Sequence, residues 1–348
     1  MPNDRLIAHH RNQQDVEPLP KSTLTFAYGN FRYQKMTEEL SGTDDLLRTK
    51  TLIEVIEDLK HTSSVVDAVR SDLCPELRRA LTDSNDTIRE LASRSFASIA
   101  RVREGKVYLA EHGIITDIAR LFDDAQEHIR RNAYDALLFL SEMREGCEAV
   151  VAAGIIEVLV DKTISEKTER VMIQTLTLIQ QLLQLHQGSL RALKTPVVVR
   201  MKRLLESVSS ELKRLAAENL ATLSFLPAGK KKVIEEGCVA PLSAQLFDDI
   251  VEVRGAALLA LASLSIENDA KVQLIEGQVL DRIMALLSDK SAQNRLNAIQ
   301  LVSNVAEHPV AKVEFQSALN RLRDLIDSEN EIIAQYAGKA IDAITWRP

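Results

Sequence analysis

A unit of about 40 residues recurs along nearly the whole chain. Its clearest copy begins as a helix at Val251 and ends at Gly277. The apolar residues of this copy follow the i, i+3, i+4 rhythm that places side chains on one helical face: Val253, Ala256, Ala257, Ala260, Leu261 and Leu264. A shorter helical pattern follows a break at Glu267–Asp269. A chain of this kind grows by adding units and needs no enlarged central core.

The copies keep an even spacing along the chain. Alignment on the residue three places before the first core alanine, or its equivalent, gives Thr49, Arg89, Arg130, Glu169, Lys213, Arg254, Arg295 and Ala334. Successive positions are 39 to 44 residues apart. The fourth copy departs most, because Glu169 stands where its neighbours carry Arg or Lys and the longest step follows it. This departure predicts a longer helix or a local bend in the fourth repeat.

Glycines eight residues apart run in phase with the units. The pairs are Gly105 and Gly113, Gly146 and Gly154, and Gly229 and Gly237, while Asp269 with Gly277 and Gly188 with Pro196 keep the interval. We expect the first glycine to turn the chain out of the long helix at positive φ, and the second to end a short helix. Two breaks per unit mean three helices per unit. The sequence therefore predicts an all-α armadillo-repeat fold, a right-handed α-solenoid of about seven to eight repeats of about 40 residues.

The two ends of the chain differ from the repeats. Residues 1–25 are polar and have no helical period, which predicts an extended or disordered arm. We assign residues 26–348 to the armadillo-repeat domain, with an N-terminal capping repeat at 26–84 and a C-terminal capping helix at 329–348. Aromatic residues gather between Phe26 and Tyr33. This segment either covers the open face of the first repeat or docks a partner.

Composition narrows the classes of function. The net charge is −7 and the pI is about 5.6, which argues against nucleic-acid binding through a broadly basic surface. No apolar run approaches the roughly 20 residues of a membrane span, and the first residues have no apolar stretch typical of a secretory signal. Three cysteines stand far apart, at Cys74, Cys147 and Cys238. We interpret them as buried small apolar residues in a reducing compartment.

No pattern of catalytic or cofactor-binding residues stands out. The sequence lacks GxxxxGK[ST], HExxH, GxSxG and any Cys–His pair at metal-ligand spacing. Acid pairs fall at the junctions between units, at Asp44–Asp45, Asp123–Asp124 and Asp248–Asp249. We expect these carboxylates to cap helix N-termini. The sequence therefore predicts neither an enzyme nor a site for a cofactor, a metal or a small-molecule substrate.

The surface left for function is the groove formed by successive long helices. Armadillo importins resemble this layout, but they line the groove with a Trp and, four residues later, an Asn in most repeats. Of the equivalent positions here, only Asn304 matches that pattern. The groove instead suits a protein segment, either a helix or an extended strip. The residues expected to line it are Arg94, Asp135, Gln174, Glu218, Leu259, Gln300 and Asn304.

Short stretches near both ends are similar to a narrower family. Near one end they are Ala27-Tyr28-Gly29, Glu38-Glu39-Leu40, Asp45-Leu46-Leu47 and Lys50; near the other they are Arg295-Leu296-Asn297-Ala298, Ala306-Glu307 with Pro309, and Trp346-Arg347-Pro348. In this order and spacing they resemble the radial spoke head 14 homolog family. The length and the repeat number fit that family over roughly residues 25–348.

The resemblance implies a non-catalytic armadillo subunit of the radial spoke, the scaffold that links outer doublet microtubules to the central pair in motile cilia and flagella. It implies a place in the cytoplasm and cytoskeleton, at the axoneme. The implied partners are other radial spoke proteins of the stalk or head, with no nucleic acid and no membrane. We expect terminal contacts at Phe26, Tyr28, Trp346 and Arg347. The alternative is a soluble cytoplasmic armadillo adaptor in signalling or trafficking.

Overall fold

The computed structural model describes residues 31–346, and all regular secondary structure in that range is helical. The chain divides into two units, Met1–Tyr108 and Leu109–Pro348. Both consist of helices that pack on their neighbours in the sequence, so the fold is an all-α armadillo-type solenoid, as the repeat spacing predicted. No helix within the described range is long and apolar enough to cross a membrane.

The first unit holds two long helices and the shorter helices packed against them. Its helices are α2 (Phe31–Ser41), α3 (Asp45–Asp58), α4 (Thr62–Arg70), α5 (Leu73–Ala80) and α6 (Asp86–Ile99), and α7 (Arg103–Glu111) spans the division between the units. Helix α2 packs on α3 and α5. Tyr33 of α2 is buried and donates its hydroxyl hydrogen to Asp58 Oδ2 at 2.5 Å. Phe31, in contrast, is 72% exposed.

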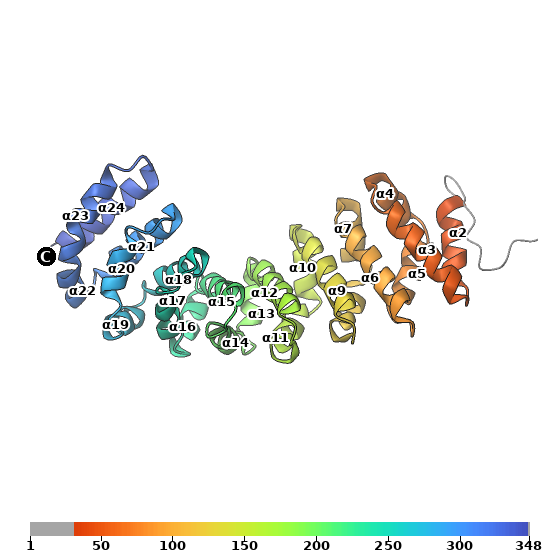
Figure 1. Ribbon diagram of the computed structural model, residues 1–348, viewed down its shortest axis with the longest axis horizontal. Helices are drawn as coiled ribbons and strands as arrows, with labels where there is room; N and C mark the ends of the chain where they lie inside the picture. Colours follow the sequence, from red (N-terminus) through yellow and green to blue (C-terminus); the bar gives the residue numbers. More distant parts are fainter. Residues whose placement is uncertain (1–30, 347–348) are drawn as a thin grey trace, which may run out of the picture. The chain divides into compact units, whose positions relative to one another are not determined.

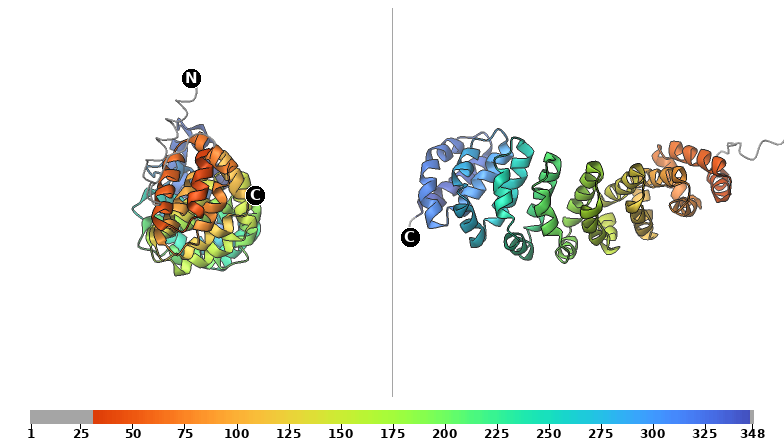
Figure 2. Two further views of the ribbon diagram at one scale, coloured as in Figure 1. Left: turned by 90° about the vertical axis from the view of Figure 1, so that its right-hand side faces the viewer. Right: turned by 60° about the horizontal axis from the view of Figure 1, so that its bottom comes forward.

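The second unit repeats a set of two shorter helices followed by one long helix. The long helices are α9 (Glu127–Ser141), α12 (Glu169–Leu183), α15 (Ser210–Leu223), α18 (Val251–Leu264), α21 (Ala292–Val305) and α24 (Glu331–Thr345). Each packs against the next in chain order, which Figure 1 and the turned view of Figure 2 both show. Three helices per repeat is the armadillo arrangement that the paired breaks predicted.

The shorter helices of this unit lie between the long ones in the sequence. They are α8 (Ile115–Arg120), η1 (Leu121–Asp123), α10 (Arg144–Ala152), α11 (Ile155–Ser165), α13 (His186–Ala192), α14 (Val197–Leu204), α16 (Pro227–Glu235), α17 (Val239–Gln245), α19 (Asn268–Glu276), α20 (Leu280–Leu286), α22 (Pro309–Glu314), η2 (Phe315–Ala318) and α23 (Leu319–Ile326).

Apolar faces of the long helices form the core, as the i, i+3, i+4 pattern predicted. In α18 the residues Val253, Ala257, Leu261 and Leu264 have no exposed surface. The three cysteines are free and buried, which confirms their interpretation as small core residues. Burial raises the pKa of the Cys238 thiol to about 12, so the reactive thiolate form is scarce at neutral pH.

The N-cap residues give the repeat a more regular register than the sequence alignment did. They are Asp44, Asn85, Gln126, Thr168, Ser209, Ile250, Ser291 and Asn330, each 41 or 42 residues after the previous one except the last, which follows after 39. The position four residues after the N-cap therefore falls on Arg48 and Met172, and the alignment on Thr49 and Glu169 was wrong by one and three residues. Helix α12 has 15 residues, as α9 does, so the long helix of the fourth repeat is not extended, and the alternative, a local bend in that repeat, stays a prediction.

The first glycine of each pair has a different role from the one expected. Gly105, Gly146, Gly188 and Gly229 lie inside short helices and do not have positive φ. A Cβ atom at any of them would lie 2.0 to 2.2 Å from the carbonyl oxygen of the residue six places earlier, near the end of the preceding long helix. These glycines therefore permit a close approach of two helices.

The second glycine does have the left-handed conformation. Gly113, Gly154 and Gly237 have φ between 66° and 79°. In the copy used to define the repeat, however, Gly277 has φ −72° and Gln278 takes the left-handed conformation with φ 54°. The breaks of that repeat therefore lie one residue later than predicted, with buried Ala270 at the position of the first glycine.

In four repeats an arginine four residues after the N-cap holds the loop at the start of the long helix. Arg254 Nη1 donates to the carbonyl oxygens of Asp248 and Asp249 at 2.9 and 3.0 Å, and its Nη2 lies 2.8 Å from Asp289 Oδ2 of the next repeat. The same bonds to the preceding loop are made by Arg89, Arg130 and Arg295. We call these cations, with the carboxylates that pair with them, the loop ladder.

The rungs of the loop ladder join successive repeats. Further pairs of this kind are Arg48 with Asp83, Arg130 with Glu166, and Lys213 with Asp248. The fourth repeat lacks both members, because Met172 replaces the cation and Ser207 replaces the acid. Ser207 Oγ keeps only the local role, accepting from Ser209 N–H at 3.2 Å.

The junction acids only partly fulfil their predicted role as helix caps. Asp44 does cap α3, because its carboxylate accepts from the N–H groups of Leu46 and Leu47. Asp124 and Asp248 instead accept from the N–H of the N-cap residues Gln126 and Ile250. Their recurrence therefore reflects the turn before each long helix and, for Asp248, the loop ladder.

Candidate protein-binding groove

The predicted groove residues lie on consecutive long helices. In the second unit, Asp135 is on α9, Gln174 on α12, Glu218 on α15, Leu259 on α18, and Gln300 and Asn304 on α21, and all six are half-buried. We call the surface that carries them the groove face. Arg94 lies on α6 of the first unit, where its side chain is exposed.

Polar side chains in the first part of the groove face bond to one another. Gln174 Nε2 donates to Asp135 Oδ1 at 2.6 Å and to the carbonyl oxygen of Arg131 at 3.3 Å. Gln180 Nε2 donates to Glu218 Oε2 at 2.9 Å. Little of this hydrogen-bonding capacity is left for a ligand.

The same region neutralises its own charges. Arg214 pairs with Glu211 and with Glu218, the former at 2.6 Å. The hydrogen bond from Arg214 holds the pKa of Glu211 below its usual value, and the bond to Glu211 raises the pKa of Arg214. We give the name middle groove to five of these bonded residues: Asp135, Gln174, Gln180, Arg214 and Glu218.

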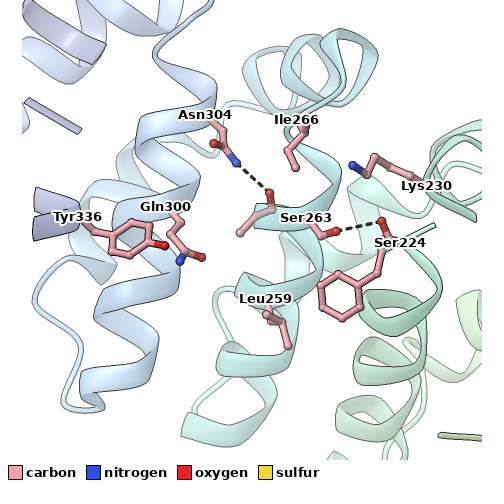
Figure 3. Close-up of a pocket in the computed structure, with 10 residues that line it drawn as sticks. Ser224, Lys230, Leu259, Ser263, Ile266, Gln300, Asn304 and Tyr336 are labelled. Carbon is pink, nitrogen blue, oxygen red and sulfur yellow. Dashed lines mark hydrogen bonds between the residues drawn. The ribbon is translucent and has the colours of Figure 1, made fainter. Parts of the chain in front are cut away.

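A hollow of about 390 Å³ follows on the groove face between α15, α18, α21 and α24. We call it the C-terminal pocket, and Figure 3 shows it in close-up. Its lining residues are Ser224, Phe225, Lys230, Leu259, Ala262, Ser263, Ile266, Gln300, Asn304 and Tyr336. Three of the predicted groove residues, Leu259, Gln300 and Asn304, are thus brought together here.

Three hydrogen bonds fix the walls of the C-terminal pocket. Asn304 Nδ2 donates to the carbonyl oxygen of Ala262 at 2.9 Å and to Ser265 Oγ at 3.1 Å, which ties α21 to α18. Ser263 Oγ donates to the carbonyl oxygen of Ser224 at 3.2 Å, which ties α18 to the end of α15 (Figure 3). Asn304, the one residue that matches the importin pattern, therefore donates its amide N–H groups to other residues of this chain.

The remaining lining of the C-terminal pocket is apolar or unpaired. Phe225 is 66% exposed and Ile266 is 59% exposed, and both line the same hollow. The ammonium group of Lys230 points across the pocket toward Ile266 (Figure 3). Neither Lys230 nor Gln300 bonds through its side chain to any residue in the range 31–346. No lining residue in that range is Asp or Glu.

A second cation lies beside the C-terminal pocket. Lys339 Nζ is 4.6 Å from the centroid of the Tyr336 ring, and Tyr336 lines the pocket. A cation over an aromatic face is attracted by the ring quadrupole. The pocket thus has a lysine on the α16 side and another on the α24 side.

The predicted terminal contacts fall largely beyond the described range. Phe26, Tyr28 and Arg347 lie outside residues 31–346. Trp346 is 63% exposed, its ring lies 5.1 Å from Lys312 Nζ, and its carbonyl oxygen accepts from Lys312 Nζ at 3.0 Å. The indole therefore offers an apolar surface at the end of α24.

Sequence reasoning missed Phe225, Lys230, Ile266 and Tyr336. It followed one position on each long helix, whereas Phe225 and Ile266 come directly after the C-cap serines Ser224 and Ser265. They stand 41 residues apart, at the same place in successive repeats. A large apolar residue at the end of a helix in two successive repeats was the available signal.

No group of three or more His, Cys, Asp or Glu side chains in residues 31–346 is arranged to hold a metal ion. The groove face offers hydrogen-bonding and apolar side chains on fixed helices. Together with repeats of three helices, this arrangement defines a repeat scaffold of the armadillo class.

Comparison with known protein sequences found a similar relative. No family model matches the chain. Over 153 residues the chain is 25% identical to Radial spoke protein 14 of Chlamydomonas reinhardtii, a match that covers 44% of this chain and 40% of that relative.

Comparison with solved structures concerns the fold. The crystal structure of an engineered protein superposes with a TM-score of 0.82 over 91% of this chain and 79% of its own, at 19% identity. A designed armadillo repeat protein gives a TM-score of 0.46 at 23% identity, with 78% of this chain and 99% of its own covered. The first of these likenesses supports the fold alone.

Proposed function

We propose that this chain is a non-catalytic structural subunit of the axonemal radial spoke in motile cilia or flagella. In this role the repeats hold neighbouring spoke proteins of the stalk or head through the groove face and the ends. The observation that carries the proposal is the similarity to Radial spoke protein 14 over 153 residues.

The packing within the second unit supports a mechanical role. Each long helix packs against the next, and three rungs of the loop ladder, from Arg130, Lys213 and Arg254, tie the loop before one long helix to the loop before the next. The Arg254–Asp289 pair is nearly buried, with 11% and 3% of the side-chain surfaces exposed. Breaking such a pair leaves a charge without its partner, so the geometry between repeats resists deformation.

The surface chemistry supports binding rather than catalysis. The polar side chains of the middle groove hydrogen-bond or form ion pairs with one another, and the cysteine thiols are buried with raised pKa values. The exposed apolar residues of the C-terminal pocket are of the kind that anchor protein interfaces. The role needs no cofactor, small-molecule substrate, nucleic acid or membrane.

Fractionation of ciliated cells of the source organism tests the proposal. The chain should remain with demembranated axonemes after detergent extraction and leave them under conditions that remove radial spokes. Axonemes from cells that lack the chain should show missing or incomplete spokes. Quantitative recovery in the detergent-soluble fraction, with intact spokes in its absence, would overturn the proposal and favour a soluble adaptor.

A further inference from the structure

We propose that the C-terminal pocket binds a short partner segment in which a bulky apolar side chain is flanked by Asp or Glu. The inference deepens the proposed function, since the segment would belong to a protein held by the groove face. It states what such a partner must carry, whichever spoke protein that is.

The apolar part of the proposal follows from the exposed side chains. Phe225 and Ile266 lie at the ends of α15 and α18, and Leu259 lies between them on the pocket lining. Phe225 and Ile266 each keep more than half of their surface exposed. Burying such surface under a partner side chain is favourable, and a pocket of this kind takes one large anchor.

The acidic part follows from the charges around the pocket. Lys230 reaches across the pocket without an ion pair to any described residue, and Lys339 stands over the Tyr336 ring on the other side. No lining residue within the described range carries a carboxylate, although the whole chain has a net charge of −7. A carboxylate beside the apolar anchor would pair with either lysine, and a basic segment would be repelled.

The same observations disfavour nucleic acid as the occupant. Binding to a phosphate backbone draws on many cations along a track. The lining residues of this pocket include a single lysine, and the middle groove beside it holds Asp135 and Glu218. The polar lining that remains free, at Gln300, suits hydrogen bonds to a peptide backbone.

Selection from a random peptide library displayed on phage, with the purified full chain as bait, tests the proposal. Enriched peptides should carry a large apolar residue with Asp or Glu close on either side. The variants Lys230→Glu and Phe225→Ala should each weaken binding of a representative enriched peptide by about tenfold, measured by fluorescence anisotropy. Lys230→Glu should also shift the selected flanking residues from acidic to basic.

Two matched controls separate the pocket from general surface effects. Lys231 is the next residue on α16, is 77% exposed at its side chain and pairs with Glu235, so Lys231→Glu makes the same charge change outside the pocket lining. Phe247 is 58% exposed and lies beneath Arg282, also outside the lining, so Phe247→Ala removes a comparable aromatic ring. Both controls should bind the enriched peptide as the unmodified chain does. All four variants should keep the thermal unfolding curve of the unmodified chain.

Three results would overturn the inference. The first is enrichment of peptides with basic flanking residues. The second is equal binding of the enriched peptide by the pocket variants and the controls. The third is that the unmodified chain enriches no more peptide than a bait that carries both Lys230→Glu and Phe225→Ala. The axoneme fractionation does not depend on the peptide result. A chain that sits in spokes but selects no such peptides would refute the inference alone, and the converse would refute the proposed function alone.

Discussion

The middle groove and the C-terminal pocket lie on different copies of the same repeat, and side chains at equivalent positions form different contacts in the two regions. Glu218 in the middle groove is held by Gln180 and Arg214, whereas Gln300 in the pocket bonds to no described residue. The difference lies in which side chains are left unsatisfied. Repeats with the same backbone can therefore differ in binding. In some of them the polar side chains bond to a neighbouring repeat, and in others they stay available to a partner.

A second contrast concerns the loop ladder. In the fifth and sixth repeats Lys213 and Arg254 pair with the next loop, while the fourth repeat has Met172 and Ser207 at the equivalent positions. The cation and the acid are lost together, so neither is left as an unpaired charge. In the seventh repeat, by contrast, the acid alone is lost, because Ser328 stands at the acid position while Arg295 still bonds to the loop before its own helix.

The largest effect should come from charging the core instead of the groove. Leu261 is fully buried, whereas Leu259, on the same helix, lines the C-terminal pocket. Leu261→Asp loses about 1.5–3 kcal/mol of burial, and an unpaired buried carboxylate adds a further large penalty. We expect loss of cooperative unfolding near α18 for Leu261→Asp and a nearly unchanged melt for Leu259→Asp, by circular dichroism. Equal melting of the two variants would remove the distinction between core and groove.

A rung of the loop ladder should contribute less than the core. Arg254→Met copies the fourth repeat but leaves Asp289 with 3% of its side chain exposed and no cation, which should cost about 3 kcal/mol in chemical denaturation. Arg144→Met is the matched control, because Arg144 pairs with Glu148 on the open surface. That control should not change stability measurably. Equal losses in both variants would show that burial of the rung is unimportant.

The next largest loss of stability should come from low pH, because acid protonates the carboxylates of the loop ladder. Burial alone would raise the pKa of Asp289, but the Ser291 N–H and the Arg254 guanidinium outweigh burial and hold that pKa below its usual value. The pKa of Asp248 is lowered in the same way, beside Lys213. Since the folded pKa lies below the unfolded value of about 4, this stability is present above pH 4 and is lost as pH falls through the folded pKa. The melting temperature should hold from pH 7 to about pH 5 and then drop, less steeply in Asp289→Asn. An unchanged acid limb in that variant would contradict the assignment.

The smallest change in stability should come from single groove residues. Glu218→Gln keeps an acceptor for Gln180 but removes the charge beside Arg214, at a cost of about 0.5 kcal/mol. It should not affect an acidic peptide bound in the C-terminal pocket. Gln300→Glu should leave stability unchanged and weaken that peptide, because it places a carboxylate in the lining. The opposite pattern in peptide binding would reverse the roles given to the two regions.

Much of the fold could be predicted from spacing, because each repeat must bury the same apolar face against its neighbour. The register of the fourth repeat could not be predicted. Thr168 caps α12 without a side-chain hydrogen bond, and Met172 occupies the position at which other repeats carry the cation. The role of Gly229 also escaped prediction. A glycine needed for close helix approach and one needed for positive φ look alike in a sequence. Only the Leu223 carbonyl oxygen, 2.1 Å from where a Cβ would lie, distinguishes them.

The candidate site was only half predictable. Leu259, Gln300 and Asn304 follow from one position per helix, so periodicity located them. Phe225 lies in the turn beyond α15, where no helical period applies, and Lys230 lies on the short helix α16, outside the long helices on which the groove residues were predicted. Gln174 bonds to Asp135, which lies 39 residues earlier in the previous repeat. Gln300 bonds to no described side chain of the repeat before it. Such pairings are fixed by tertiary packing.

Cross-linking mass spectrometry on intact axonemes tests the central claim most directly, since it reports which proteins touch this chain in place. The account predicts cross-links from Lys230 and Lys339, beside the C-terminal pocket, to acidic segments of other radial spoke proteins. Cross-links from these lysines exclusively to proteins outside the spoke, or their full modification by a soluble reagent in assembled spokes, would contradict it.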